Sequence, residues 1–406
     1  MSRAARTVFI EESRTPIYRR IAHAIGAELL QRGMQVFAVN PHAMDSSTFL
    51  AFLSQQNADA IFVSNASSHL IQSRAAGSAE YAFEKFAGRL IFVHQDAILG
   101  GLKVLDGLNK LQAWQRVNQR AVHLCIEADN IADLATAGIR AALVPHASEI
   151  QAAEPCVDQF DYDASFVGHV VPSSYAPPLS DVPRYQSAIE HMLAARRVNF
   201  AMPLEPNVKA CVDQALSGLG HESDRPLLRL AMAQWLRNEV TKQTMPLRGW
   251  VFEACGLDRI DIFGGDPAYL HNVARSLQIE RDGVHHHPAV YDQEAVQQIF
   301  NRSRVSINIS SLQFDHAVVN RFHDVIMSGG LCLTDARDGL SQLTPLHAEV
   351  SYRTLAELKE KADYFARPEK ARERALLIQA LQRDVARNSG YGLLAAAIVQ
   401  AIDTLS

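Results

Sequence analysis

Short apolar runs alternate with amphipathic helical patterns through the first 150 residues of the chain. Helical spacing of apolar residues marks 17–31 and 46–54, with a Ser or Asp as the expected cap of the second helix. Strands are predicted at residues 7–10, 35–39, 58–64, 90–94, 122–126 and 141–144. Because these strands are apolar almost throughout, both of their faces are expected to be buried. The order predicts a parallel sheet covered by helices on both sides.

The same alternation restarts after a polar connection at 149–162. The segment ASFVGH, which follows Asp163, is interpreted as the first strand of this second half, and further strands are predicted at residues 259–263, 305–310, 331–333 and 349–352. A chain of 406 residues is too long for one ordinary core. We therefore expect a first domain at 1–150 and a second at 151–388. The last helix, 389–406, either returns to the first domain or packs on its own.

Three successive helical patterns fill residues 175–250, a block longer than an α/β domain of this kind requires. The sequence leaves two interpretations of this helical block open. It is either a dimerisation element, which would make the protein a homodimer, or a surface that recognises an acceptor.

The stretch 305–335 concentrates the candidate chemistry. A strand is followed by a polar loop, an amphipathic helix, Gly329-Gly330 and a second buried strand. Loop, helix start and strand end then meet at the carboxyl edge of a parallel sheet, where ligands bind in open α/β folds. Arg321 at the helix start suits a diphosphate, and Asp324 one turn later suits ribose hydroxyls. The alternative is a structural ion pair of Arg321 with Asp324 or Asp315.

The segment Asn320-Arg-Phe-x-Asp324, followed by Gly329-Gly330 and Leu-Cys-Leu-Thr-Asp, resembles the donor-binding segment of GT-B glycosyltransferases. The most similar group is that of the spore-maturation-protein CgeB. This resemblance implies an α/β fold with two Rossmann-like domains facing a central cleft, with the helical block inserted in the second. It also implies metal-independent use of a nucleotide-sugar donor. Asp324 replaces the usual Glu, and His316 and Asp324 stand in the places of an E-x7-E pair. Retention or inversion of the sugar configuration therefore stays open.

Further donor-binding positions follow from the same resemblance. Glycine turns come after two predicted strands, and a histidine-rich segment stands where such domains bracket the nucleotide base. The expected donor-binding residues are Gly168, Gly264, Gly265, His287, Pro288, Tyr291, Ser311, Asn320, Arg321 and Asp324. For Gly168, a simple tight turn is an equally good interpretation.

Catalysis on the acceptor side is expected at the carboxyl edge of the first sheet. His94 is the candidate general base and Asp96 the residue that orients it. A satisfied strand-end histidine is the alternative for His94. His316 is a further candidate, in reach of a sugar hydroxyl or the phosphate.

Composition and motifs limit which partners, cofactors and cellular locations are expected for this protein. With 44 acidic against 39 basic residues and no basic run, the charge argues against a nucleic-acid partner. The sequence EESRTPIY follows the first strand in place of a G-x-G-x-x-G, which argues against a nicotinamide or flavin cofactor. Five scattered cysteines without a C-x-x-C, no long apolar run and no signal-peptide core predict a cytoplasmic protein. The run His285-His286-His287 lacks ligand spacing, so no metal site is predicted.

Three functions remain compatible with these features. The first is a glycosyltransferase acting on an unidentified acceptor. The second is an epimerase of the same fold that uses carboxylates such as Glu11, Glu12 and Asp96. The third is a non-catalytic scaffold built on the helical block.

Overall fold

The computed structural model describes residues 6–11, 16–39, 45–64, 71–72, 74, 80–168, 183–218, 225–264 and 283–405. It divides the chain into two compact units. Unit 1 comprises Met1–Pro145, Val212–Asn238 and Gly390–Ser406, and unit 2 comprises His146–Cys211 and Glu239–Ser389. Residues 212–238, which the sequence analysis placed in the second domain, thus cluster with the N-terminal unit.

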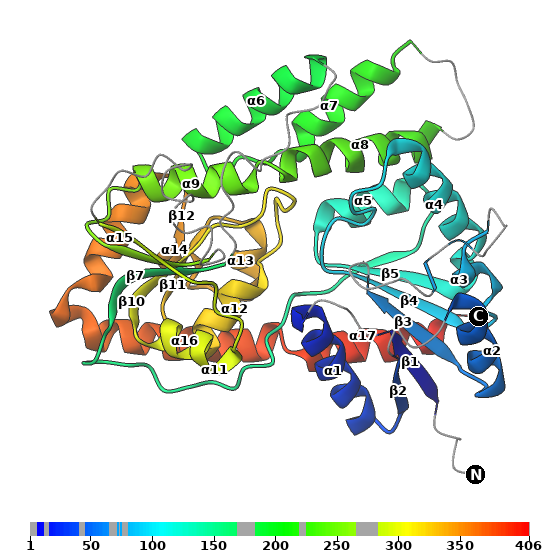
Figure 1. The fold of residues 1–406 in the computed structure, drawn as a ribbon, viewed down its shortest axis with the longest axis horizontal. Coiled ribbons are helices and arrows are strands. Elements are labelled where there is room, and N and C mark those ends of the chain that lie inside the picture. Colours follow the sequence, from blue (N-terminus) through cyan, green and yellow to red (C-terminus); the bar gives the residue numbers. More distant parts are fainter. Residues whose placement is uncertain are drawn as a thin grey trace. The chain divides into compact units, whose positions relative to one another are not determined.

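Unit 1 is built on a six-stranded sheet in the order β2-β1-β3-β4-β5-β6 (Figure 1). Its strands are β1 Thr7–Glu11, β2 Gln35–Val39, β3 Ala60–Ser64, β4 Arg89–His94, β5 Ala121–Cys125 and β6 Ala141–Leu143. All adjacent pairs are parallel. Every residue of β3 and β5 is buried, which explains why these strands carry no alternating polar positions.

Helices cover this sheet. They are α1 Pro16–Gln31, α2 Ser46–Gln55, α3 Ala82–Lys85, α4 Val104–Arg116, α5 Ala128–Thr136 and α17 Tyr391–Thr404, with a 3-10 turn at Asn118–Arg120. Asp45 caps α2, since its carboxylate accepts the Thr48 N–H at 2.8 Å. The C-terminal helix α17 lies beside α1 (Figure 1), and Arg32 Nη2 donates to Gly392 O at 2.8 Å.

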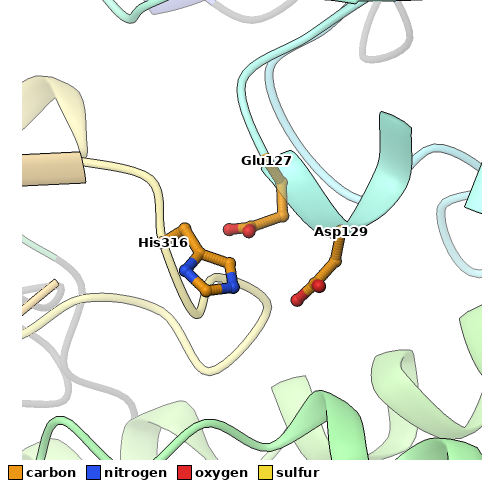
Figure 2. A group of neighbouring side chains, drawn as sticks. All are labelled: Glu127, Asp129 and His316. Atoms are coloured by element: carbon orange, nitrogen blue, oxygen red, sulfur yellow. The ribbon is translucent and has the colours of Figure 1, made fainter. Parts of the chain in front are cut away.

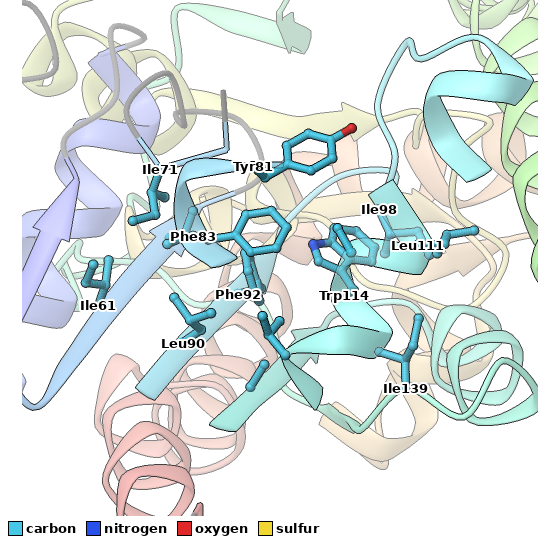
Figure 3. Packing of buried hydrophobic residues seen from close by; sticks show 14 of the residues in the cluster. Ile61, Ile71, Tyr81, Phe83, Leu90, Phe92, Ile98, Leu111, Trp114 and Ile139 are labelled. Atoms are coloured by element: carbon cyan, nitrogen blue, oxygen red, sulfur yellow. The ribbon is translucent and has the colours of Figure 1, made fainter. Parts of the chain in front are cut away.

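An aromatic cluster forms the core of unit 1 (Figure 3). Phe92 on β4 packs against Phe83 and Trp114, with ring centroids 5.5 and 5.8 Å apart. Large aromatic side chains contribute most of the apolar area that such a core removes from water. Leu227 and Leu230 belong to the same cluster. Their burial explains why the middle of the helical block clusters with unit 1.

Unit 2 contains the second six-stranded sheet, in the order β12-β11-β10-β7-β8-β9. Its strands are β7 Tyr162–Val167, β8 Ile260–Phe263, β9 Val284–His287, β10 Ser303–Asn308, β11 Cys332–Asp335 and β12 Ser351–Tyr352. All adjacent pairs are again parallel. β7 and β10 lie at the centre of the sheet, and their carboxyl ends therefore mark the middle of its edge.

The remaining helices belong wholly or partly to unit 2. They are α6 Pro183–Val198, α7 Glu205–Leu216, α8 Arg225–Thr241, α9 Thr244–Ala254, α11 Gln293–Asn301, α12 Asn320–Met327, α13 Asp338–Leu343, α14 His347–Val350, α15 Leu355–Ala366 and α16 Ala371–Asn388, with a 3-10 turn at Pro368–Lys370. The division between the units falls within α7 and α8. Helix α14 occupies part of the strand predicted at 349–352, which shortens β12. None of the five cysteines, all of which lie in the described part of the chain, forms a disulfide. No helix in the described part of the chain is long and apolar enough to cross a membrane.

Replacement of Gly329 by alanine tests the turn that ends α12. Gly329 has a φ of +78°, and a Cβ at this position would lie 2.6 Å from Asn301 Nδ2 and 2.8 Å from Glu154 O. We expect Gly329→Ala to destabilise unit 2 by about 2–4 kcal/mol, because left-handed strain and overpacking add. Urea unfolding of the purified variant measures this loss.

Gly256→Ala is the matched control. Gly256 has a similar φ of +68°, but its Cβ would meet only the flexible Lys359 chain, at 3.2 Å from Cδ. A loss of about 1–2 kcal/mol is expected there, from strain alone. Equal losses of unfolding free energy in the two variants would show that the atoms around Gly329 move aside at no cost, which would contradict the prediction.

Candidate functional site

The candidate donor site is organised by Arg321, the second residue of α12. Its Nε donates to Val167 O at 2.7 Å, and its Nη1 donates to Asn308 Oδ1 at 2.8 Å. These acceptors lie at the ends of β7 and β10, the two central strands. Burial lowers the pKa of the guanidinium from its ordinary value. The cation is thus fixed at the carboxyl edge of the sheet, as the sequence predicted.

Asn308 is held in turn by its neighbours. Its Nδ2 donates to Thr334 Oγ1 at 2.9 Å, and its carbonyl accepts the Tyr352 hydroxyl at 2.8 Å. Asp335 accepts the Ser310 N–H and hydroxyl at 2.9 and 2.8 Å. The ends of β10, β11 and β12 are therefore joined in one buried polar network, and this network holds Asn308 in place to accept the hydrogen bond from Arg321.

Neither structural partner that the sequence suggested for Arg321 is an ion-pair partner in the structure. Asp315 pairs with the buried Arg196 at 2.6 Å and accepts the N–H groups of Leu204 and Glu205, each at 2.8 Å. Asp324 accepts the Ser148 hydroxyl at 2.6 Å. Among the described residues, Arg321 forms no ion pair. Its positive charge is consequently available to an anionic ligand.

Gly168 lies directly against this guanidinium. It follows β7, and a Cβ at this position would collide with Arg321 Nη2 and lie 3.2 Å from Cζ. Glycine is therefore required here for a close approach, rather than for the turn alone. The Arg321 guanidinium also stacks over the buried Phe166 ring, with Cζ 4.7 Å from the ring centroid.

A second arginine, Arg248 of α9, approaches the same Phe166 ring, with Cζ 5.6 Å from the centroid. It is 7% exposed, and its Nη2 donates to Ile309 O at 3.2 Å. Burial, reinforced by the charge of Arg321, lowers the pKa of Arg248 to about 9. The sequence analysis missed this residue, because α9 carries no motif that distinguishes Arg248 from a surface arginine.

The first turn of α12 has no side-chain cap. Val319 occupies the N-cap position, and no acidic residue lies in the first turn. Asn320 is half-buried, and its Oδ1 is a buried oxygen without a hydrogen-bond partner in the described structure. Exposed N–H groups at a helix start attract anions, and the adjacent guanidinium strengthens this attraction.

The segment 284–291, which was expected to bracket the nucleotide base, begins with the edge strand β9. His287 Nε2 bonds to Asp261 Oδ1 at 2.7 Å, and Gly264 N–H donates to His287 O at 3.4 Å. Pro288 and Tyr291 follow in an exposed stretch, and Tyr291 is 74% exposed. Gly265 lies outside the described residues.

Ser311 is half-buried in the polar loop that follows β10. Its hydroxyl lies 3.4 Å from that of Thr244, the first residue of α9, which also accepts the Leu312 N–H at 3.1 Å. The loop is therefore tied to the start of α9.

His94 is a core residue of unit 1, at variance with the open sheet edge expected for a general base. It is 1% exposed, its Nε2 lies 2.8 Å from His123 Nδ1, and the two rings stack with centroids 5.1 Å apart. Burial, together with the charge of Lys110, lowers the pKa of His94 to about 3. The alternative interpretation, a structural strand-end histidine, therefore fits better, although only Nε2 is hydrogen-bonded and the buried Nδ1 has no partner among the described residues. Alternation places His94 on the same face of β4 as Phe92, but it does not show that Trp114 and His123 enclose the ring there.

Asp96, in contrast, is half-buried beyond the end of β4 and accepts a short hydrogen bond from the Tyr18 hydroxyl. Burial and the Asp96 charge raise the pKa of Tyr18, so the phenol stays protonated and acts as the donor. The Glu11 side chain and residue Glu12 lie outside the described structure.

His316 lies in the loop before α12 of unit 2, where its Nδ1 is 3.1 Å from Asp338 Oδ2. Figure 2 draws this side chain together with Glu127 and Asp129 at the start of α5 in unit 1. Glu127 is buried, and Asp129 faces Arg237 at 3.9 Å.

The chain is similar to known proteins in part of its sequence and in its fold. A family model described as glycosyl transferase-like matches residues 245–397, which include Arg248, His287 and Arg321. T4 phage β-glucosyltransferase in complex with UDP-glucose is similar over 98% of this chain and 99% of its own, with TM-score 0.54 and 10% identity. A glycosyltransferase from Rickettsia africae covers 99% of both chains, with TM-score 0.52 and 9% identity. The chain has the GT-B fold.

An α-glucosyltransferase in complex with UDP and a DNA 13-mer shares this GT-B fold, with TM-score 0.52, 8% identity and coverage of 98% of this chain and 100% of its own. No curated protein matches the sequence. The family model and the three solved structures named here are described as glycosyltransferases, and none of these four descriptions names the CgeB-like group.

The buried histidine pair makes the stability of this GT-B protein dependent on pH. The folded pKa values of His94 and His123 lie below the ordinary value of 6.5. The unfolded chain therefore binds more protons below that pH, and folding stability falls as the pH drops from about 6.5 toward 3. His94→Gln and His123→Gln variants should show a shallower decline, by up to about 1.4 kcal/mol per pH unit for each histidine removed. Thermal unfolding between pH 7 and pH 4 provides the test, and identical slopes in wild type and variants would contradict it.

Proposed function

We propose that the protein is a glycosyltransferase that moves a sugar from a nucleoside-diphosphate sugar to an acceptor. The observation that carries this proposal is the Arg321 guanidinium. It is fixed by Val167 and Asn308, has no ion-pair partner among the described residues, and lies beside Gly168 at an uncapped helix start. This arrangement suits a diphosphate, which brings the negative charge that the site lacks.

The same arrangement supplies catalytic power. As the glycosidic bond of the donor breaks, negative charge develops on the leaving diphosphate. A fixed cation aimed at that charge stabilises the transition state more than the ground state. Arg248, one ring away across Phe166, adds a second positive charge to this region. We propose that these arginines and the α12 N–H groups neutralise the diphosphate, so that transfer proceeds without a metal or other cofactor.

Uridine diphosphate is the donor nucleotide that the comparisons favour, since T4 phage β-glucosyltransferase of the same fold is described with UDP-glucose. The DNA 13-mer described with the α-glucosyltransferase is not carried over to this chain as an acceptor. A net charge of −5 gives no electrostatic support for binding a polyanion. Within the glycosyltransferases, the sequence Asn320-Arg-Phe-x-Asp324 supports a relationship to the CgeB-like group.

On the acceptor side we assign the general base to Asp96 rather than His94. Asp96 lies at the carboxyl edge of the first sheet and is partly accessible, whereas His94 is enclosed by Phe92, Trp114 and His123. A carboxylate can take the proton of an acceptor hydroxyl as it attacks the sugar. The Tyr18 hydroxyl orients that carboxylate.

Arg321→Ala tests the donor site. A charge-assisted contact contributes about 1.5–3 kcal/mol, so the variant should bind UDP roughly ten- to a hundredfold more weakly than wild type. Calorimetric titration of the folded variant measures the affinity. Arg302→Ala is the control, because Arg302 is a half-exposed arginine of unit 2 that pairs with Asp161 at 3.3 Å. Unchanged UDP affinity in Arg321→Ala would remove the main support for a glycosyltransferase.

Asp96→Asn tests the base. The amide keeps the shape of the side chain but cannot accept a proton, so release of UDP from UDP-glucose should slow by roughly 10²- to 10⁴-fold. UDP affinity should not change, because the assignment places Asp96 on the acceptor side. Tyr18→Phe, which keeps the carboxylate and removes only its orienting hydrogen bond, should have a smaller effect. Normal turnover of Asp96→Asn would assign the base to another residue.

A further inference from the structure

His287 is held in one orientation by a buried carboxylate. Its Nε2 lies 2.7 Å from Oδ1 of Asp261, which is 0% exposed, and its ring stacks on Phe263 with centroids 4.3 Å apart and planes 11° from parallel. A carboxylate only accepts hydrogen bonds, so Nε2 carries the proton, and in the neutral imidazole Nδ1 carries the lone pair. Asp261 therefore determines which nitrogen of His287 is an acceptor.

The accepting nitrogen has no partner in the part of the chain that the structure describes. Among the described residues His287 Nδ1 makes no hydrogen bond, and it is not among the buried polar atoms that lack a partner. The side chain is 35% exposed. The neighbouring His286 differs from His287, since both nitrogens of its ring are buried without partners in the described structure. His287 thus presents a fixed, accessible acceptor at the edge of the sheet.

A role as mere counter-ion for Asp261 does not explain this arrangement. Arg259 Nε already lies 3.1 Å from Asp261 Oδ2 and provides a positive charge. His287 bonds to the other oxygen, Asp261 Oδ1, and its ring is held both by this hydrogen bond and by stacking on Phe263. Such a carboxylate–imidazole pair is a common means of presenting the opposite nitrogen to a ligand.

His287 lies at the correct separation from Arg321 for the two ends of one nucleotide. Val167, Phe263 and His287 are paired across β7, β8 and β9, and each ends its strand. Arg321 is bonded to Val167 O at the first of these ends. Two strand spacings separate Val167 from His287, which is about 10 Å. A nucleoside diphosphate, in which the ribose separates base from phosphates, spans such a distance along the edge.

We propose that His287 Nδ1 accepts the N3–H of uracil and selects uridine nucleotides at the donor site. Asp261 is the positioning residue, because it fixes the tautomer of His287 without touching the base. The inference rests on the proposed function, since it places the diphosphate of the same nucleotide on Arg321. Cytosine has an acceptor at N3 in place of the uracil donor, so its lone pair would face that of His287. The site therefore rejects CDP by leaving a polar contact unmade.

Wild-type protein tests the inference with two ligand pairs. Calorimetric titration should show UDP binding roughly three- to tenfold more tightly than CDP, the worth of one neutral hydrogen bond. The diphosphate of 3-methyluridine, which lacks the N3–H, should bind at least as weakly as CDP. Equal affinities for UDP and CDP, or for UDP and its 3-methyl derivative, would overturn the proposal without any variant.

His287→Phe then assigns the preference to the histidine. The phenyl ring keeps the stacking on Phe263 and removes the acceptor nitrogen, so UDP should bind as weakly as CDP, and CDP affinity should stay within about twofold of wild type. His285→Phe is the matched control, because His285 is an exposed residue two positions earlier on the same strand. It should keep the wild-type preference for UDP. A preference that survives in His287→Phe would refute the role of His287.

Inorganic pyrophosphate separates this inference from the proposed function. Pyrophosphate needs only the Arg321 region, so wild type, His287→Phe and His285→Phe should bind it alike. Wild-type protein that binds neither UDP nor pyrophosphate would refute the donor site itself, and with it this inference. Binding of pyrophosphate and UDP without discrimination between uracil and cytosine would refute the role of His287 alone.

Discussion

The hydrogen bonds from Arg321 to Val167 and Asn308 fix the geometry on which the donor site depends. One guanidinium joins the ends of the two central strands to the first turn of α12. Phe166 supports its face, and Gly168 permits its approach. No side chain of the described structure pairs with this charge as an ion pair. A buried cation without a carboxylate destabilises a fold, and a bound anion reverses that penalty. Ligand affinity and stability of unit 2 are therefore coupled through this residue.

Most strands of the two sheets were predictable from the sequence, because strands such as β3, β5 and β8 are buried throughout and largely apolar. The histidine-rich strand β9 was not predicted, because it is neither apolar nor fully buried. The sequence did not predict α9 as a separate helix within the helical block. Its buried residues do not form a single apolar face, and they include Thr244, Arg248 and Gly249. Residues 347–350 form the short helix α14, so the strand predicted at 349–352 is reduced to Ser351–Tyr352.

The candidate site was predictable where local sequence determines it, and not where distant residues do. Arg321 at the start of a helix after a polar loop is a local pattern, and the structure places it at the sheet edge. The partner of Asp315 is 119 residues away in sequence, at Arg196, and no local pattern indicates this pairing. His94 likewise depends on His123 and Trp114, which come from other elements. The orientation of His287 required knowledge that Asp261 lies on the adjacent strand.

The division of the chain into units has a consequence for how the protein can form. The chain passes between the units at residues 145–146, 211–212, 238–239 and 389–390. Helix α17, which lies against α1, comes after all of unit 2 in the sequence. During synthesis the first sheet therefore emerges long before the helix that covers α1, which stays incompletely packed while unit 2 is translated. Neither unit corresponds to a continuous fragment, and a single cut between residues 145 and 146 would divide unit 1 while leaving all of unit 2 on the second fragment.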